Sequence, residues 1–139
     1  MTPEDIAELA LSLPEVTEEE PYGPSRPVYK VGGSIFAMLA AATRTHPDQV
    51  TVKCEPRLAL HLCEQHAGVR PWYQGRRWHW LTVHLNDDTV SDEDLTDMLH
   101  HAWDCVVAGL PAATRNRLRA LHHEREDRQV NASEGPSHQ

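Results

Sequence analysis

The chain has few of the features that mark secreted, membrane-spanning or disulfide-rich proteins. Its three cysteines form neither a CxxC pair nor an even set, so we expect buried thiols rather than a disulfide framework or a structural zinc site. The longest apolar run covers eight residues, 35–42, which is too short to cross a bilayer. The N-terminal segment MTPEDIAELALSLPEV is acidic, whereas a secretory signal begins with basic residues. We therefore expect a cytoplasmic protein that contacts no membrane.

Sequence motifs of catalysis are also missing. There is no HExxH motif, no nucleophile elbow and no glycine-rich phosphate loop. The ten histidines include the adjacent pairs His100-His101 and His122-His123, whose side chains would point about 100° apart on a helix and so are poorly placed to share an ion. His100 and Asp104 would share one helix face, but no further ligand set accompanies them. We expect no enzyme activity, no metal site and no cofactor.

Positive charge is scarce and unevenly distributed. The net charge is −8; residues 1–23 and 87–110 each hold seven acids and no Lys or Arg, whereas residues 24–86 hold eight basic residues and three acids. The acidic balance argues against strong non-specific binding of nucleic acid, which depends on neutralising phosphates with Lys and Arg. The basic middle segment still permits a local positive face.

Hydrophobic periodicity predicts an α+β domain in the order α-β-β-β-α-β-β-α, with a further helix possible at the end. The predicted helices cover residues 3–13, 57–66, 92–110 and 112–125, and the predicted strands cover 27–31, 34–39, 50–54 and a hairpin that ends with 78–85. Gly32-Gly33 is expected to form the turn of the first hairpin. In the connection 15–24, two prolines and a glycine are expected to prevent regular structure. Such an order gives an antiparallel sheet of about five strands with helices on one face.

The C-terminal segment lacks periodicity. Residues 129–139, QVNASEGPSHQ, are polar and include Gly and Pro, so we expect a disordered tail. Residues 1–128 are expected to form a single domain, because a chain of this length fits one hydrophobic core. We expect a monomer.

The segment RPWYQGRRWHW, residues 70–80, concentrates three of the four tryptophans and three arginines without one acid. Guanidinium groups contact phosphates and aromatic rings stack on bases, so the pattern is typical of a nucleic-acid surface. It also fits an ordinary hairpin whose indoles pack under helices. In the strand from Trp78, alternation places Leu81, Val83 and Leu85 on the core side and Trp78 with Trp80 on the other.

Several segments in the same order resemble the MmcQ/YjbR family. They are LSLPEVTEE (11–19), the connection Pro21 to Pro24, VYKVGGSIFAML (28–39), VTVKCEP (50–56), GVRPWYQGRRWHWLTV (68–83) and CVVAGLP (105–111). The resemblance as a whole covers roughly residues 6–111. The family's tyrosine, basic pair and His-Trp fall on Tyr73, Arg76-Arg77 and His79-Trp80. Two features depart from the family pattern: the aromatic Trp78 and a longer basic segment after Pro111.

The resemblance implies a fold and a function. The fold would be CyaY-like or secretion-chaperone-like, with a twisted antiparallel sheet against helices. The family is labelled DNA-binding, through strands and loops called a "double wing", and it offers no catalytic residues to transfer. The candidate nucleic-acid-binding residues are Lys30, Lys53, Arg57, Arg70, Tyr73, Arg76, Arg77, Trp78 and Trp80. The alternative is a protein or peptide interaction module, favoured by the acidic charge and by an apolar patch at Trp78 and Trp80.

Overall fold

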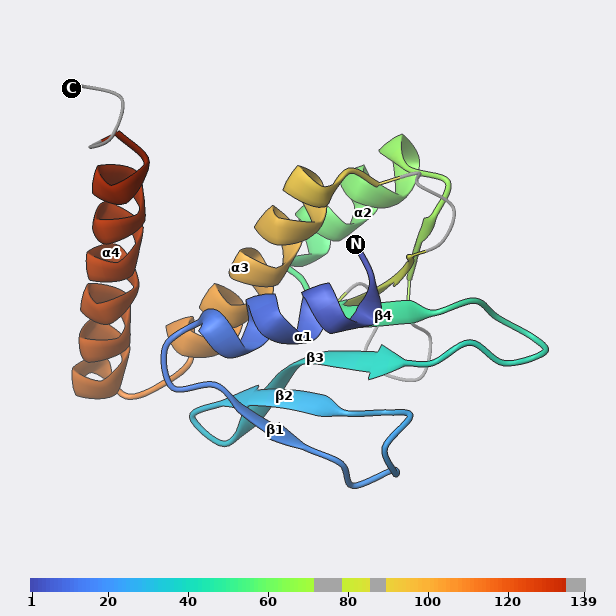
Figure 1. Ribbon diagram of the computed structural model, residues 1–139, viewed down its shortest axis with the longest axis horizontal. Helices are drawn as coiled ribbons and strands as arrows, with labels where there is room; N and C mark the ends of the chain where they lie inside the picture. Colours follow the sequence, from blue (N-terminus) through green and yellow to red (C-terminus); the bar gives the residue numbers. More distant parts are fainter. Residues whose placement is uncertain (72–78, 86–89, 135–139) are drawn as a thin grey trace.

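The computed structural model describes residues 1–71, 79–85 and 90–134, with side chains up to Arg128 (Figure 1). In chain order, the elements are α1 (Pro3–Ser12), β1 (Thr17–Glu19), β2 (Val28–Val31), β3 (Ser34–Ala40), β4 (Gln49–Lys53), α2 (Pro56–Gln65), β5 (Val69–Pro71), β6 (Trp80–His84), α3 (Asp92–Ala108) and α4 (Ala112–Glu134). The predicted α+β class is confirmed. Among these described residues, no helix is both long enough and apolar enough to cross a membrane.

The strands form one antiparallel sheet in the order β1-β2-β3-β4-β6-β5. The first four strands are neighbours in sequence, and β6 then inserts between β4 and β5. The predicted hairpin around the Arg-aromatic segment is confirmed by its two strands, since Arg70 of β5 pairs with Thr82 of β6. Residues 72–78, which connect these strands, lie outside the described part of the chain.

The prediction for the connection 15–24 was wrong at its start, because residues 17–19 form β1 at the edge of the sheet. All three residues of β1 are exposed, so no hydrophobic alternation marks the strand. Its stability comes from pairing with β2: Glu18 lies opposite Tyr29, whose hydroxyl donates a hydrogen bond of 2.6 Å to the Glu18 carboxylate. Burial is the larger cause that raises the pKa of Tyr29, and the hydrogen bond to the Glu18 carboxylate raises it further, so the phenol stays protonated.

The predicted two-glycine turn joins β2 to β3. Gly32 and Gly33 have φ values of 58° and 82°, and positive φ at both central residues is what the favoured two-residue hairpin turn requires. The flanking residues Val31 and Ser34 form the last pair of the ladder. A bulge interrupts the same ladder next to Tyr29 and allows the neighbours Phe36 and Ala37 of β3 both to be buried in the core.

Helix starts agree with the capping signals in the sequence. Thr2 caps α1 in a capping box with Asp5, and the Ser91 side chain caps α3 by accepting a 3.1 Å hydrogen bond from the Asp94 backbone N–H. Such caps satisfy backbone donors that the first turn of a helix leaves unpaired. The α2 helix is capped by Glu55, whose carboxylate accepts hydrogen bonds from two backbone amides of the first turn.

The helices pack against one face of the sheet, with α3 at the centre of the layer (Figure 1). The core side of β6 holds Leu81 and Val83, as alternation predicts, and Leu85 after the strand is also buried. Within the part of the chain that the structure describes, Trp103 of α3 has the largest fully buried side chain, and its indole N–H donates to the Pro14 carbonyl at 3.2 Å. This bond joins α3 to the end of α1. Of the three cysteines, Cys54 is buried, whereas Cys63 and Cys105 are half-buried.

The last helix, α4, lies beside α3 at the edge of the helical layer (Figure 1). Its Leu118 is buried in the core, Arg119 forms an ion pair with Asp104 at 3.4 Å, and Arg117 binds Glu15. The helix continues through residues 129–134, which composition assigns to a tail. Nothing in the sequence stops it earlier, since the first Gly and Pro after residue 111 are at 135 and 136.

Candidate nucleic-acid interface

Strand register decides which candidate residues share the outer face of the sheet, the face opposite the helices. Val52 of β4 lies in the helix-side core, so strand alternation assigns the next residue, Lys53, to the outer face. Lys53 is the last residue of β4, where it also lines a small pocket with residues of α2 and α3. Lys53 pairs across the sheet with Trp80 of β6, and Thr82 of β6 pairs with Arg70 of β5. The structure therefore brings Lys53, Trp80 and Arg70 together on three adjoining strands.

The exposure of these three residues differs. Arg70 is exposed, whereas Lys53 and Trp80 are half-buried. Between them, Thr82 is almost buried and shares a 3.0 Å hydrogen bond between hydroxyls with Thr51 of β4. The two threonine hydroxyls at the centre of the outer face are thus hydrogen-bonded to each other. The cationic and aromatic side chains lie nearer the edge of the sheet that β5 forms.

Lys30 lies on the same face but farther from β5. It pairs with Ile35 of β3, while the next residue, Val31, belongs to the helix-side core. The Lys30 ammonium forms a 2.7 Å ion pair with Glu19 of β1. Because this carboxylate offsets its charge, Lys30 adds less positive potential than its position alone suggests.

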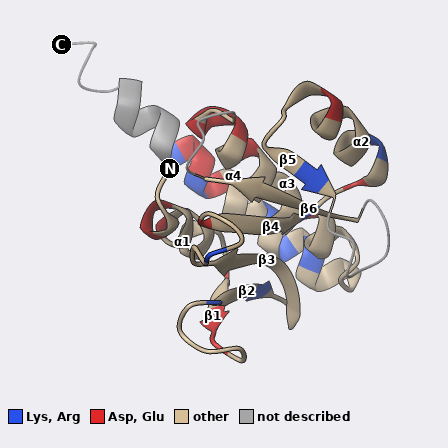
Figure 2. Cartoon of the chain, turned by 90° about the vertical axis from the view of Figure 1, so that its right-hand side faces the viewer, with Lys and Arg blue, Asp and Glu red and all other residues tan. Residues whose placement is uncertain are grey.

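Arg57 is on a helix, so strand register does not place it on the outer face. It lies in the first turn of α2, within the helical layer, and its backbone N–H donates a 3.1 Å hydrogen bond to the Glu55 carboxylate. These bonds from the helix amides lower the pKa of Glu55 and keep a negative charge beside Arg57. Figure 2 shows the basic residues of α2 and β5 in the same part of the molecule and acidic residues on β1. Arg57 is thus a neighbour of the face rather than a member of it.

The remaining candidates are Tyr73, Arg76, Arg77 and Trp78. They lie outside the described residues, so their role stays a prediction. The chain enters this segment from Pro71 on β5 and leaves it through His79, whose carbonyl accepts a 2.8 Å hydrogen bond from the Cys54 N–H. Both ends of the segment are therefore anchored beside the Lys53 end of β4.

A hollow of about 430 Å³ lies elsewhere on the outer face. Its lining includes Tyr22, Arg26, Val28 and Met38. Tyr22 is 64% exposed although its ring is large and hydrophobic. Sequence reasoning did not identify this hollow, because residues 20–27 show no periodic pattern and reach the sheet only through the tertiary fold.

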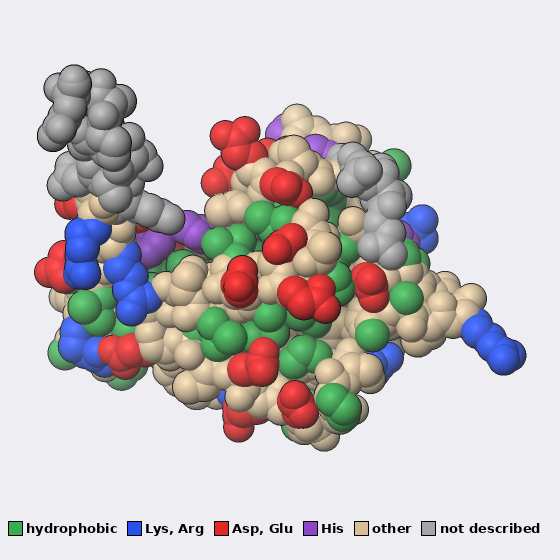
Figure 3. Space-filling model, in the orientation of Figure 1, with side chains coloured by type: hydrophobic (Ala, Val, Ile, Leu, Met, Phe, Trp, Pro, Cys, Tyr) green, Lys and Arg blue, Asp and Glu red, His purple; other side chains and the backbone are tan. Residues whose placement is uncertain are grey.

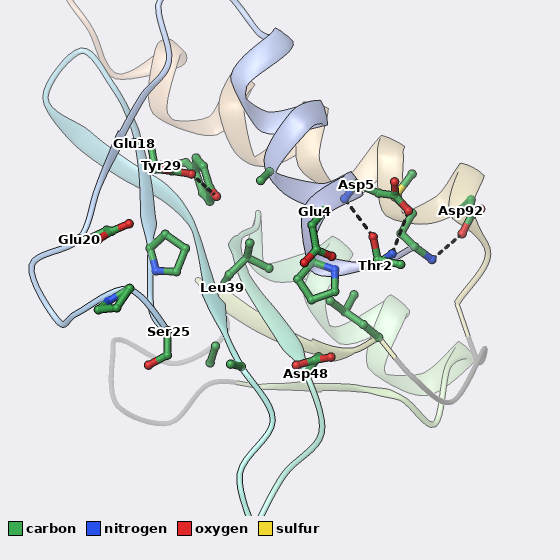
Figure 4. Close-up of a pocket in the computed structure, with 18 residues that line it drawn as sticks. Thr2, Glu4, Asp5, Glu18, Glu20, Ser25, Tyr29, Leu39, Asp48 and Asp92 are labelled. Atoms are coloured by element: carbon green, nitrogen blue, oxygen red, sulfur yellow. Dashed lines mark hydrogen bonds and ion pairs between the residues drawn. The ribbon is translucent and has the colours of Figure 1, made fainter.

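A cavity beside α1 has an acidic lining. It measures about 870 Å³ and lies between α1, the end of β3 and the segment before β2 (Figure 4). Among the described residues, six carboxylates line it and no Lys, Arg or His does; the six are Glu4, Asp5, Glu18, Glu20, Asp48 and Asp92. The N-terminal ammonium binds one of them, Asp92, at 2.9 Å. A polyanion would be repelled here.

The face drawn in Figure 3 is acidic over its centre, with carboxylates scattered across the α1 and α3 region. Basic side chains in this view gather on α4 at the left and at the far right. An anionic partner is therefore repelled by the α1 and α3 part of the helical side.

Known proteins share this chain's sequence and fold. The YjbR family model matches residues 11–105. The uncharacterized protein YbdF of Escherichia coli O157:H7 is 33% identical over 116 residues, covering 84% of this chain and 93% of that protein. The uncharacterized protein YjbR of Escherichia coli strain K12 is 32% identical over 89 residues, covering 64% and 73% of the two chains.

Two solved structures are similar as well. The crystal structure of Deinococcus radiodurans protein DR2400 superposes with a TM-score of 0.74 at 28% identity and covers 84% of this chain and 87% of its own. A Pseudomonas syringae protein superposes with a TM-score of 0.65 at 18% identity, covering 76% and 98%, and shows the fold alone. The family match and the relatives agree with the motifs at 11–19, 28–39 and 68–83. The chain belongs to the YjbR family.

Proposed function

We propose that this protein binds nucleic acid weakly through the outer face of its sheet. The observation that carries the proposal is the alignment of Lys53, Trp80 and Arg70 on adjoining strands, beside the two ends of the Arg-aromatic segment. Cationic groups contact phosphates and an indole stacks on bases without reading their sequence. A net charge of −8 keeps such binding weak and strongly salt-dependent.

The test measures fluorescence anisotropy of labelled single-stranded and duplex DNA over a series of salt concentrations. The variant Lys53→Ala/Arg70→Ala removes two cations from the outer face. Each lost phosphate contact should reduce the slope of log K against log salt by about 0.7 to 0.9, so the double variant should bind more weakly and with a flatter salt dependence.

The matched control is Arg115→Ala/Arg128→Ala, which removes two positive charges from α4 and leaves the sheet unchanged. It should keep the wild-type salt slope. Equal losses in the two double variants would show that binding follows net charge rather than the outer face. Absence of binding by the wild type at low salt and high protein concentration would reject the nucleic-acid function altogether.

A second candidate function rests on the hollow beside Tyr22. An exposed tyrosine next to Val28 and Met38 offers an apolar contact surface with a polar tip, which suits the side chain of a peptide or protein partner. Selection from a displayed peptide library should yield ligands that bind the wild type and lose affinity at least tenfold on Tyr22→Ala. Ligands that bind the Tyr22→Ala variant equally well would exclude the hollow as the docking site.

A further inference from the structure

Two helices bring three metal-ligating side chains together at the α3–α4 contact. His100 comes from α3, and His122 and Glu126 come from successive turns of α4. One ligand atom of each residue lies within 4.8 Å of the other two. The spacing i, i+4 places His122 and Glu126 on the same face of α4, directed at the α3 histidine.

The geometry is close to that of a bound ion. His122 Nε2 and Glu126 Oε1 are 3.2 Å apart, and ligands at 2.0–2.1 Å from a tetrahedral Zn²⁺ are separated by about 3.3 Å. The ring centroids of His100 and His122 are 5.2 Å apart with an interplanar angle of 72°. Completing the set requires the His100 ligand atom to approach the other two, which lie within 4.8 Å of it.

The set joins two imidazoles with one carboxylate. A neutral imidazole is the form that ligates metals, and the nearby carboxylate of Glu126 supplies a negative charge for a cation. Three protein ligands leave a fourth position for water, as in zinc sites that are not purely structural.

We propose that His100, His122 and Glu126 bind a divalent transition-metal ion, Zn²⁺ in the first place, and that the ion fastens α4 to α3. Nitrogen ligands from two imidazoles with one carboxylate suit zinc and its neighbours better than Mg²⁺ or Ca²⁺, which prefer oxygen ligands alone. Two of the three ligands lie beyond residue 105, where the family match ends. The site is therefore a property of this chain's C-terminal helix and is independent of the outer face of the sheet.

The competing interpretation is a packed cluster of aromatic rings. His122 also lies 5.0 Å from the centroid of Trp103, and such contacts contribute to helix packing without any ion. The two interpretations differ in their response to added metal. A packed cluster gains no stability from Zn²⁺, whereas an ion-binding site raises the melting temperature as the ion concentration exceeds Kd.

The experiment uses the full, tag-free chain after treatment with EDTA. Calorimetric titration with Zn²⁺ should give one site per chain, and saturating Zn²⁺ should raise Tm by roughly 5 °C. Co²⁺ should bind the same site and give the visible absorption of a tetrahedral complex. Glu126→Gln should weaken Zn²⁺ binding at least tenfold; its side chain is 48% exposed, so the metal-free fold should persist, which the metal-free Tm checks.

His123→Ala is the matched control, because His123 is adjacent to His122 and its side chain is 76% exposed, with only a long 3.9 Å contact from its Nδ1 to Glu126 Oε2. It should retain the wild-type Kd within about twofold, whereas His100→Gln should lose binding as Glu126→Gln does. The proposal is wrong if the wild type shows no Tm rise with Zn²⁺, or if Glu126→Gln and His100→Gln bind Zn²⁺ as tightly as the wild type. A loss on His123→Ala as large as that on Glu126→Gln would also overturn it.

Discussion

Replacing Gly32 by alanine should destabilise the domain more than the same change at Gly33, although the two glycines are adjacent in one turn. Both have positive φ, a conformation that costs an alanine roughly 1–2 kcal/mol. Their surroundings differ. A Cβ at Gly32 would lie 2.7 Å from both methyl carbons of Leu110, whereas a Cβ at Gly33 meets nothing within 4 Å.

The magnitude follows from adding the steric contribution to the backbone cost. Leu110 follows α3 and packs against the hydrophobic core, so its side chain has limited freedom to withdraw. Forcing extra carbon into such a contact costs roughly 1–3 kcal/mol. We therefore expect Gly33→Ala to lower the free energy of unfolding by about 1 kcal/mol and Gly32→Ala to lower it by about 3 kcal/mol.

Urea denaturation followed by circular dichroism measures both changes. A double-mutant cycle isolates the steric part: Leu110→Ala removes the methyl groups, so Gly32→Ala should cost less in the Leu110→Ala background than in the wild type. In the same background, Gly33→Ala should cost the same as before. If the two glycine variants differ by less than about 0.5 kcal/mol and show no coupling to Leu110, the argument from the close contact fails.

Three further changes test other parts of the structure. Trp103→Phe removes the donor to the Pro14 carbonyl, and urea denaturation should show a loss of about 3 kcal/mol; a loss under about 1 kcal/mol would mean that the bond contributes little. Burial raises the pKa of Cys54 to about 12, so mass spectrometry after thiol modification at about pH 8 should find Cys54 labelled last, after the half-buried Cys63 and Cys105; earlier labelling of Cys54 contradicts this burial. Hydrogen bonds from backbone amides lower the pKa of Glu55 below its ordinary value, so its capping contributes fully to stability above the ordinary pKa of a glutamate, and this contribution is lost as pH falls through the folded pKa. Thermal melts of wild type and Glu55→Gln should therefore differ at neutral pH and converge in acid; a constant difference excludes the capping charge as the cause.

Local sequence signals predicted the long and regular elements well. Helix α3 was identifiable because Ser91 caps it and apolar residues recur at helical spacing up to the residue before Gly109. The core side of β6 followed from alternation alone. Strand β1 was missed because its three exposed residues have no apolar face, and only pairing with β2 defines it.

The candidate sites depend on contacts that a linear pattern does not contain. Lys53 and Trp80 become neighbours because β6 inserts between β4 and β5, and strand order is a property of the whole sheet. Adjacent histidines on one helix diverge, so spacing along the sequence predicts no shared ion. Asp104, which shares a helix face with His100, pairs with Arg119 instead, and His122 and Glu126 come from the second helix.

The edges of the sheet affect how copies of this chain can associate. A sheet that is not closed into a barrel exposes unpaired backbone groups along its outermost strands, where a second copy can add a strand. Here both outermost strands, β1 and β5, have three residues. Two of the three residues in β1 are glutamates, and β5 ends at Pro71, which has no N–H to donate. Each edge of the sheet is therefore a poor template for an added strand: both are short, the β1 edge is charged and the β5 edge ends in proline. These features oppose aggregation at high protein concentration.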